Sequence, residues 1–160
     1  MQKFLLAILV TVVFGTTTLV TFAQDEVPFQ NQIEARQAFM QVYRFNIGLL
    51  GAMAKGEMPY DAEQASAAAN NLLAASRMSN GAMWPAGSDM GAEGLKGMTW
   101  AKPDIWTNMP KVGKKSRALT EALEAMTASA GNGLDALRAN MGAVGDGCKG
   151  CHDPFRASKD

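Results

Sequence analysis

Five consecutive residues near the end of the chain carry the clearest chemistry in the sequence: Cys148, Lys149, Gly150, Cys151 and His152. Two thiols in a C-x-x-C spacing with a histidine directly after them are typical of a c-type haem attachment site. Each thiol can form a thioether with one vinyl group of the porphyrin, and the adjacent imidazole can bind the iron as proximal axial ligand. The motif therefore predicts one covalent haem c, held by Cys148 and Cys151, with His152 on the metal.

Three other chemistries also use closely spaced cysteines. A thioredoxin-like dithiol belongs to a strand-to-helix turn, and no βαβ pattern surrounds this motif. A structural zinc site needs four cysteine or histidine ligands, whereas the chain has 2 cysteines and 1 histidine. A plain disulfide leaves the histidine beside the second cysteine unexplained. These observations favour haem, while a haem-free dithiol oxidoreductase stays open as an alternative.

The N-terminal residues 1–23 have the pattern of an export signal. A single Lys3 is followed by a long apolar run and by a small-x-small end at Ala23, which predicts a secretory signal peptide cleaved after that residue. An uncleaved anchor is the alternative, because the run is nearly long enough to span a bilayer. Haem attachment through this motif takes place outside the cytoplasm, so both ends of the chain predict a periplasmic protein without stable membrane insertion after cleavage.

The mature part, residues 24–160, has the length of one ordinary domain. With Lys3 removed from the 15 basic side chains, 14 remain against 15 acidic ones. No basic stripe indicates nucleic acid, and no strong net field indicates a highly charged partner. The mature part is rich in Ala and Met, is poor in β-branched residues and has no alternating runs. This composition favours an all-α fold.

Four amphipathic segments are expected to position the motif. In the last segment, apolar residues and both cysteines share one stripe whose spacing alternates between three and four residues. The sequence therefore predicts an antiparallel up-down four-helix bundle that holds the haem between its helices. Region 81–103, rich in Gly, Met, Trp and Pro, is expected to be a long irregular loop. The expected helices run from 29–32 to Lys55, from the N-cap Asp61 to about 80, from Pro103 to Ala130, and from Leu134 to Phe155.

The same periodicity assigns individual side chains. Arg36 falls on the inner stripe of the first helix, where a guanidinium is costly without an anionic partner. A haem propionate is the expected partner, and the alternative is an arginine that extends to solvent at the end of the bundle. The residues expected in the core include Trp106, Met109, Met126, Met141 and Phe155. The residues expected on the outside of the first helix are Phe39, Phe45 and Leu49.

Taken together, these features resemble the class II c-type cytochromes, the group of cytochrome c′ and low-spin cytochrome c-556. The resemblance covers about 30–157, and a haem motif at the C-terminal end is itself specific to this class. It rests on the segments Arg36-Gln37-Ala38-Phe39-Met40, Lys55-Gly56-Glu57, Pro59-Tyr60-Asp61, Ala101-Lys102-Pro103-Asp104-Ile105-Trp106, and Cys148–His152 with Phe155-Arg156. It implies thioethers at Cys148 and Cys151, His152 as proximal ligand, Arg36 beside a propionate, and Arg156 near the proximal side.

By the same resemblance, Met40 faces the distal side of the iron. In low-spin members a methionine at this position is the sixth ligand, whereas high-spin members carry a residue there that does not coordinate. We expect a His152/Met40 axial pair and hence an electron carrier served by redox partner proteins. The alternative is a high-spin, five-coordinate cytochrome c′ that binds or handles NO or CO.

The resemblance and the residue spacing also bear on partners and on catalysis. Relatives often form homodimers through the first two helices, so an apolar patch on the outside of the first helix would suit a homodimer. The only histidine is committed to the haem, and no Ser/His/acid or paired-carboxylate arrangement is apparent. We therefore expect no enzyme activity.

Overall fold

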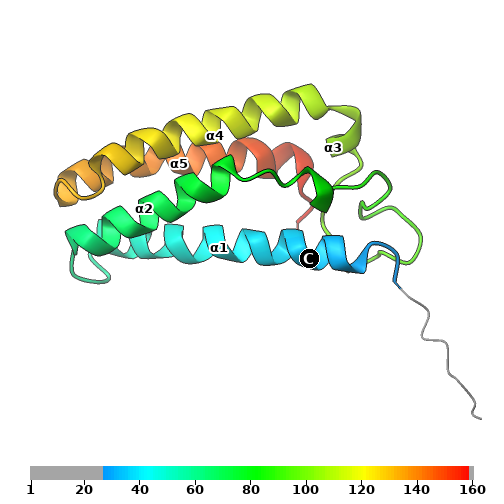
Figure 1. The fold of residues 1–160 in the computed structure, drawn as a ribbon, viewed down its shortest axis with the longest axis horizontal. Helices are drawn as coiled ribbons and strands as arrows, with labels where there is room; N and C mark the ends of the chain where they lie inside the picture. Colours follow the sequence, from blue (N-terminus) through cyan, green and yellow to red (C-terminus); the bar gives the residue numbers. More distant parts are fainter. Residues whose placement is uncertain (1–26, 159–160) are drawn as a thin grey trace, which may run out of the picture.

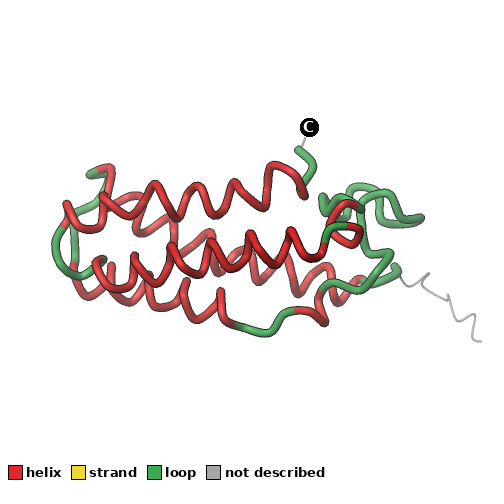
Figure 2. Tube along the Cα trace, turned by 90° about the horizontal axis from the view of Figure 1, so that it is seen from above, coloured by secondary structure: helices red, strands yellow, loops and turns green. Residues whose placement is uncertain are grey.

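The computed structural model describes residues 27–158, so the predicted signal peptide lies outside the described residues. The described part forms five α-helices and one 3₁₀ turn, with no strand apart from an isolated bridge between Ala101 and Arg156. Four long helices lie side by side in antiparallel order, which confirms the predicted bundle (Figures 1 and 2). The elements are α1 (Gln30–Lys55), α2 (Ala62–Arg77), η1 (Gly81–Met83), α3 (Asp104–Thr107), α4 (Met109–Ser129) and α5 (Leu134–Phe155).

Local sequence signals end α1 and begin α2 as predicted. Gly56 adopts a left-handed conformation with φ 76° and closes α1, a backbone state that glycine reaches without steric cost. The carboxylate of Asp61 accepts a hydrogen bond of 2.7 Å from the backbone N–H of Gln64 and caps α2. The hydroxyl of Tyr60 then ties this corner to the end of α4, because it donates to the carbonyl of Ala130 at 2.8 Å.

The apolar core fills the half of the bundle that lies away from the haem motif. It is built from α1, α2, α4 and α5, which pack as a ring in which α1 and α4 are each flanked by α2 and α5. Its large, fully buried members are Leu50, Met53, Leu72, Leu123, Met126 and Leu137. None of the helices in the described part is both long enough and apolar enough to cross a bilayer.

The prediction of one continuous third helix is wrong, because the helix is interrupted. The chain breaks at Asn108, whose φ and ψ of −129° and 32° separate the single turn α3 from α4. The reason lies two residues further on, where Pro110 has no N–H to donate to the carbonyl of Trp106 and its ring would collide with that carbonyl. The proline instead occupies the first turn of α4, where a missing N–H costs nothing.

Three side chains differ from their predicted environment. Leu49 was expected outside but is half-buried and packs against the apolar core. Met109 was expected in the core but is 53% exposed, since the break at Asn108 rotates it out of the stripe. Phe39 was expected outside but is 7% exposed, and its ring meets Tyr43 edge-on with centroids 5.3 Å apart. The helix α1 contacts α2, α5 and η1, so its buried face is wider than one heptad seam. Phe45, at 66% exposed, lies outside as predicted.

Candidate haem-attachment site

The last turns of α5 carry the C-x-x-C-H motif. Cys148 and Cys151 are three residues apart on one helix face, continue the stripe of Leu137 and Val144, and are both free thiols. Leu137 and Val144 are fully buried, whereas both thiols and His152 are half-buried. The predicted inward direction of the stripe is therefore confirmed for its apolar members, while the sulfur atoms lie nearer the surface.

The surroundings of the motif favour uncharged side chains. Burial raises the pKa of the Cys148 thiol, and the neighbouring Cys151 raises it further. Burial also raises the pKa of Cys151, against the opposing effect of the Lys115 ammonium. For His152, burial lowers the pKa, Arg156 lowers it further, and Asp153 acts in the opposite sense. A neutral imidazole is the form in which histidine binds a metal.

The donor set fits haem c. Within the described part, no hydrogen bond involves a ring nitrogen of His152, while its backbone carbonyl accepts from the N–H of Arg156 at 2.9 Å. Two free thiols and an unpartnered imidazole on neighbouring positions of one helix are the groups that attach a haem and bind its iron. Cys148, Cys151 and His152 are therefore the residues that would hold it.

The middle of α1 lies opposite the motif. Tyr43 is close enough to Cys148 for a thiolate there to raise its pKa, and burial together with this charge brings the pKa of Tyr43 to about 12. Met40 lies one turn before Tyr43 on the same side of α1, and its side chain is 38% exposed. Met40, the predicted distal residue, therefore lies on the helix that faces the predicted attachment site.

Arg36 is buried, being 3% exposed, so the alternative of an arginine extending to solvent is wrong. Its guanidinium donates to Ser88 Oγ at 2.8 Å, to Thr99 Oγ1 at 2.8 Å, and more weakly to the Met83 carbonyl at 3.5 Å. It also donates to the Ser88 carbonyl and lies 4.8 Å from the centre of the Trp84 ring. Neutral oxygen atoms of the 81–103 loop therefore accept the hydrogen bonds of Nη1 and Nη2. Burial lowers the pKa of Arg36, and the carboxylate of Asp89 in the same loop raises it.

The 81–103 loop joins this arginine to the haem-bearing end of α5. The backbone N–H of Lys102 donates to the Phe155 carbonyl at 3.0 Å, and the N–H of Ala157 donates to the Trp100 carbonyl at 2.8 Å. Sequence reasoning predicted the irregular loop but missed Ser88 and Thr99. Neither residue stands in a motif, so no local signal marked them as partners of a residue more than fifty positions upstream.

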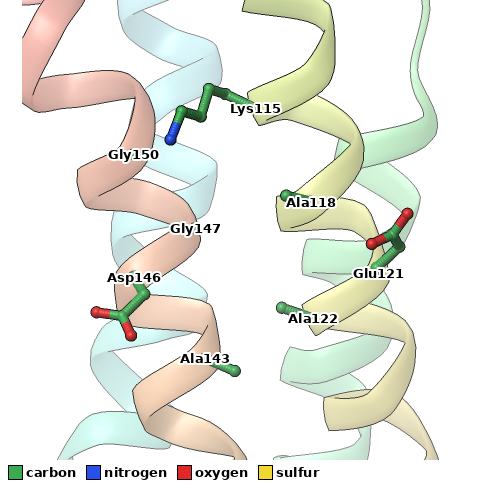
Figure 3. A pocket seen from close by; sticks show the side chains of 8 residues that line it. All are labelled: Lys115, Ala118, Glu121, Ala122, Ala143, Asp146, Gly147 and Gly150. Atoms are coloured by element: carbon green, nitrogen blue, oxygen red, sulfur yellow. The ribbon is translucent and has the colours of Figure 1, made fainter.

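Lys115 of α4 is a second neighbour of the site that sequence reasoning missed. Its side chain crosses the groove between α4 and α5 and lies over Gly150 (Figure 3). A Cβ atom placed on Gly150 would be 3.4 Å from Lys115 Cδ and 3.6 Å from Nζ. The ammonium of Lys115 therefore lies close to the backbone of the C-x-x-C motif.

Comparison with known proteins defines the class of this site. The family model described as Cytochrome C′ matches residues 31–156. A cytochrome c′ of Cereibacter sphaeroides is 38% identical over 81% of this chain and 85% of its own length, and a cytochrome c-554 of the same organism is 35% identical over 89% and 92%. A solved cytochrome c′ from Thermochromatium tepidum superposes with a TM-score of 0.71 at 35% identity, over 81% of this chain and 97% of that one.

These matches and the bundle describe a class II c-type cytochrome. The chain belongs to the cytochrome c′ family, and this membership implies a covalently bound haem c. Haem binding and a role in electron transport follow for the family as a whole.

Proposed function

We propose that the chain is a periplasmic monohaem cytochrome c′ that binds a small ligand such as NO or CO. In this proposal Cys148 and Cys151 hold one haem by thioethers and His152 is its proximal ligand. The bound haem supplies an iron that changes between two oxidation states and accepts axial ligands. The observation that carries the proposal is the placement of both thiols and an unpartnered imidazole on the inward stripe of α5, opposite α1.

The family relationship supports an open distal position. Most of the similar curated proteins are named cytochrome c′, including those of Cereibacter sphaeroides and Allochromatium vinosum. A cytochrome c′ variant from Alcaligenes xylosoxidans, 29% identical with a TM-score of 0.68, has been solved with bound carbon monoxide, and another, 30% identical, with bound NO. Met40 would then cover the distal side without coordinating, and its apolar side chain would favour uncharged ligands.

A low-spin electron carrier with a His152/Met40 axial pair is the second candidate. A methionine at position 40 is the observation in its favour, since a thioether is a suitable sixth ligand for haem iron. The relatives named cytochrome c-554, 35% and 37% identical, and the one named cytochrome c-556, 28% identical, point the same way. Both candidates share the proximal side and differ only in what Met40 does.

Arg36 keeps one donor for the haem in this proposal. Arginine has five N–H groups, and four of them, on Nη1 and Nη2, are engaged by the 81–103 loop. The Nε–H is the remaining donor and would bind a propionate. Arg36 would thus hold the loop and the cofactor at the same time.

The outer face of α1 and α2 is proposed as a homodimer contact. Phe45, Val42 and Met78 are 66%, 46% and 46% exposed, and Val42 and Met78 line a groove between the two helices. One solved relative, 33% identical, is described as a cytochrome c′ with ligand-controlled dimer dissociation. Sedimentation of the wild type and of Phe45→Glu would check this, with loss of dimer in the variant as the expected result.

One set of visible spectra tests the function. The purified protein is recorded oxidised, reduced, and reduced under CO, and we expect broad high-spin bands that shift on CO addition. Sharp low-spin bands and no response to CO would establish the second candidate instead. In that case Met40→Ala would turn high-spin, and Met40→Leu is the control that keeps the size of the side chain. A colourless protein with two titratable thiols would contradict both candidates.

N-terminal sequencing of the exported protein tests the predicted signal peptide. The sequence obtained should begin at Gln24.

A further inference from the structure

Positive charge is concentrated on the first two turns of α4, although the chain as a whole is nearly neutral. Four cationic side chains fall within seven residues: Lys111, Lys114, Lys115 and Arg117. Lys115 is half-buried and the other three are exposed. The ion pairs found among the described residues join Lys55 to Glu57, Arg77 to Glu124 and Arg138 to Asp135, so none of the four cations is in an ion pair. Lys111, Lys114 and Lys115 are neighbours on one side of α4 and are called the cationic face below, whereas Arg117, two residues from Lys115, points to another side of the helix.

The cationic face works against the helix that carries it. Unsatisfied N–H groups give the N-terminus of α4 a partial positive charge, which favours acidic residues, and the first turn of α4 contains none. Lys111 lies three residues from Lys114 and four from Lys115, so like charges are neighbours on the helix surface. The helix gains nothing from this arrangement, whereas an approaching anionic surface gains from every one of these charges.

The cationic face adjoins the attachment site. Val112, from the same turns of α4, packs on the small cluster formed by Ala101, Ile105 and Phe155 at the end of α5. Lys115 reaches across to Gly150, the residue before Cys151, as Figure 3 shows. An anionic partner bound to the cationic face would therefore lie beside the turn that carries both cysteines.

The size of the cationic face indicates what kind of anion it suits. Glu121 and Asp146 line the same groove as Lys115 and limit the positive region along the bundle. A confined patch of about two helical turns matches an acidic patch on a protein better than a long polyanion, whose charge would continue past these carboxylates.

We propose that the cationic face is the docking surface for an acidic redox protein that reduces the haem iron. This inference rests on the proposed function in either axial form, because iron must return to the ferrous state to bind CO or to pass on an electron. One electron leaves the reduced partner, which is oxidised, and Fe(III) of the haem becomes Fe(II), with no proton or group transferred. Electrostatic attraction brings the partner to this face before the electron moves.

The first experiment compares two double variants of equal net charge. K111E/K114E reverses two exposed residues of the cationic face, and K55E/R138E reverses two exposed residues at the opposite end of the bundle. Lys115 is left unchanged because it contacts Gly150. On a sulfonate cation exchanger at pH 6 we expect K111E/K114E to elute at clearly lower salt than the wild type, with K55E/R138E much closer to the wild type. An equal decrease in the eluting salt concentration for the two variants, or a larger decrease for K55E/R138E, would contradict the proposal.

The second experiment measures electron transfer with small charged probes. Ferrous holoprotein is mixed with hexacyanoferrate(III), which takes one electron from the iron and becomes hexacyanoferrate(II). At about 10 mM ionic strength we expect K111E/K114E to react roughly tenfold more slowly than the wild type and K55E/R138E within about twofold, with both differences disappearing near 0.5 M salt. With the cationic oxidant tris(phenanthroline)cobalt(III), the order of the reaction rates should be reversed, so that K111E/K114E reacts fastest.

Equal rates for the two double variants would contradict docking at the cationic face. Thermal melts of both variants verify that they are folded. The chromatographic comparison does not depend on the axial ligands of the iron, so a failure of this proposal is distinguishable from a failure of the function test by visible spectra.

Discussion

The two halves of the bundle are stabilised differently. The half away from the haem motif is an apolar core, in which Leu50, Leu72 and Leu123 have at most 1% of their surface exposed. The haem-bearing half depends on the hydrogen bonds of Arg36 to the 81–103 loop and on the small cluster around Phe155. Its cysteines and histidine are only half-buried. Stability is therefore concentrated where there is no chemistry, and the reactive side chains remain accessible to a cofactor.

The largest expected effect is a core substitution in the first half. Leu123→Ala should lower the free energy of unfolding by about 2–5 kcal/mol, because it removes buried methyl groups and leaves a cavity. Its control, Met109→Ala in the second half, should stay within about 0.5 kcal/mol, since this methionine is 53% exposed. Urea denaturation followed by circular dichroism measures both. A comparable loss in the two variants would contradict the division of the bundle.

The next effect is local to the haem-bearing half. Arg36→Met removes four hydrogen bonds, which leaves the oxygens of Ser88 without this donor and Thr99 Oγ1 with only the Ala101 N–H at 3.3 Å, and this should weaken the loop by about 1–3 kcal/mol. We expect faster hydrogen exchange and proteolysis in 83–99 with little change in α2. Arg36→Lys is the control for charge. Its loop should be nearly as mobile as that of Arg36→Met, because an ammonium cannot donate to both hydroxyls in the way a planar guanidinium does. An unchanged loop would show that Arg36 does not hold it.

A smaller effect is expected at the corner that closes the core. The hydroxyl of Tyr60 donates to the Ala130 carbonyl at 2.8 Å and accepts from the Gly133 N–H at 2.9 Å, so Tyr60→Phe should cost about 1 kcal/mol. Tyr43→Phe is the matched control, because no hydrogen bond of the Tyr43 hydroxyl is found among the described residues. Thermal unfolding of both variants gives the comparison, and equal midpoints would remove the role assigned to Tyr60.

The smallest effect appears only in alkali. Burial raises the pKa of Tyr43, and this cause persists when Cys148 is bound as a thioether, so the folded state retains the phenol proton more strongly than the unfolded chain does. The stability contributed by the neutral phenol is fully present below about pH 10 and is lost as the pH rises through the raised pKa of the folded state. The chain has 2 tyrosines, so Tyr60→Phe leaves Tyr43 as the only phenol to follow by ultraviolet absorbance. A midpoint near 10 would show that this side chain is not shielded.

Features encoded by neighbouring residues could be predicted from the sequence. The C-x-x-C-H motif, the Gly56 stop, the Asp61 cap and the stripe of α5 each depend on a few consecutive positions, and helix periodicity carries them directly into the fold. The break at Asn108 was also within reach, because Pro110 marks it, but a regular apolar spacing across that point concealed it.

The tertiary structure alone decided which distant residues meet. Arg36 looked like a partner for an anion because a buried guanidinium needs acceptors, yet the acceptors are Ser88 and Thr99, brought to it by a loop with no repeating pattern. Lys115 came to lie over Gly150 in the same way, through packing of α4 on α5. Hydrogen-bonding need and charge are properties of single residues and can be read locally. Which groups satisfy them depends on how the chain folds back on itself, and that is settled only when the helices have packed.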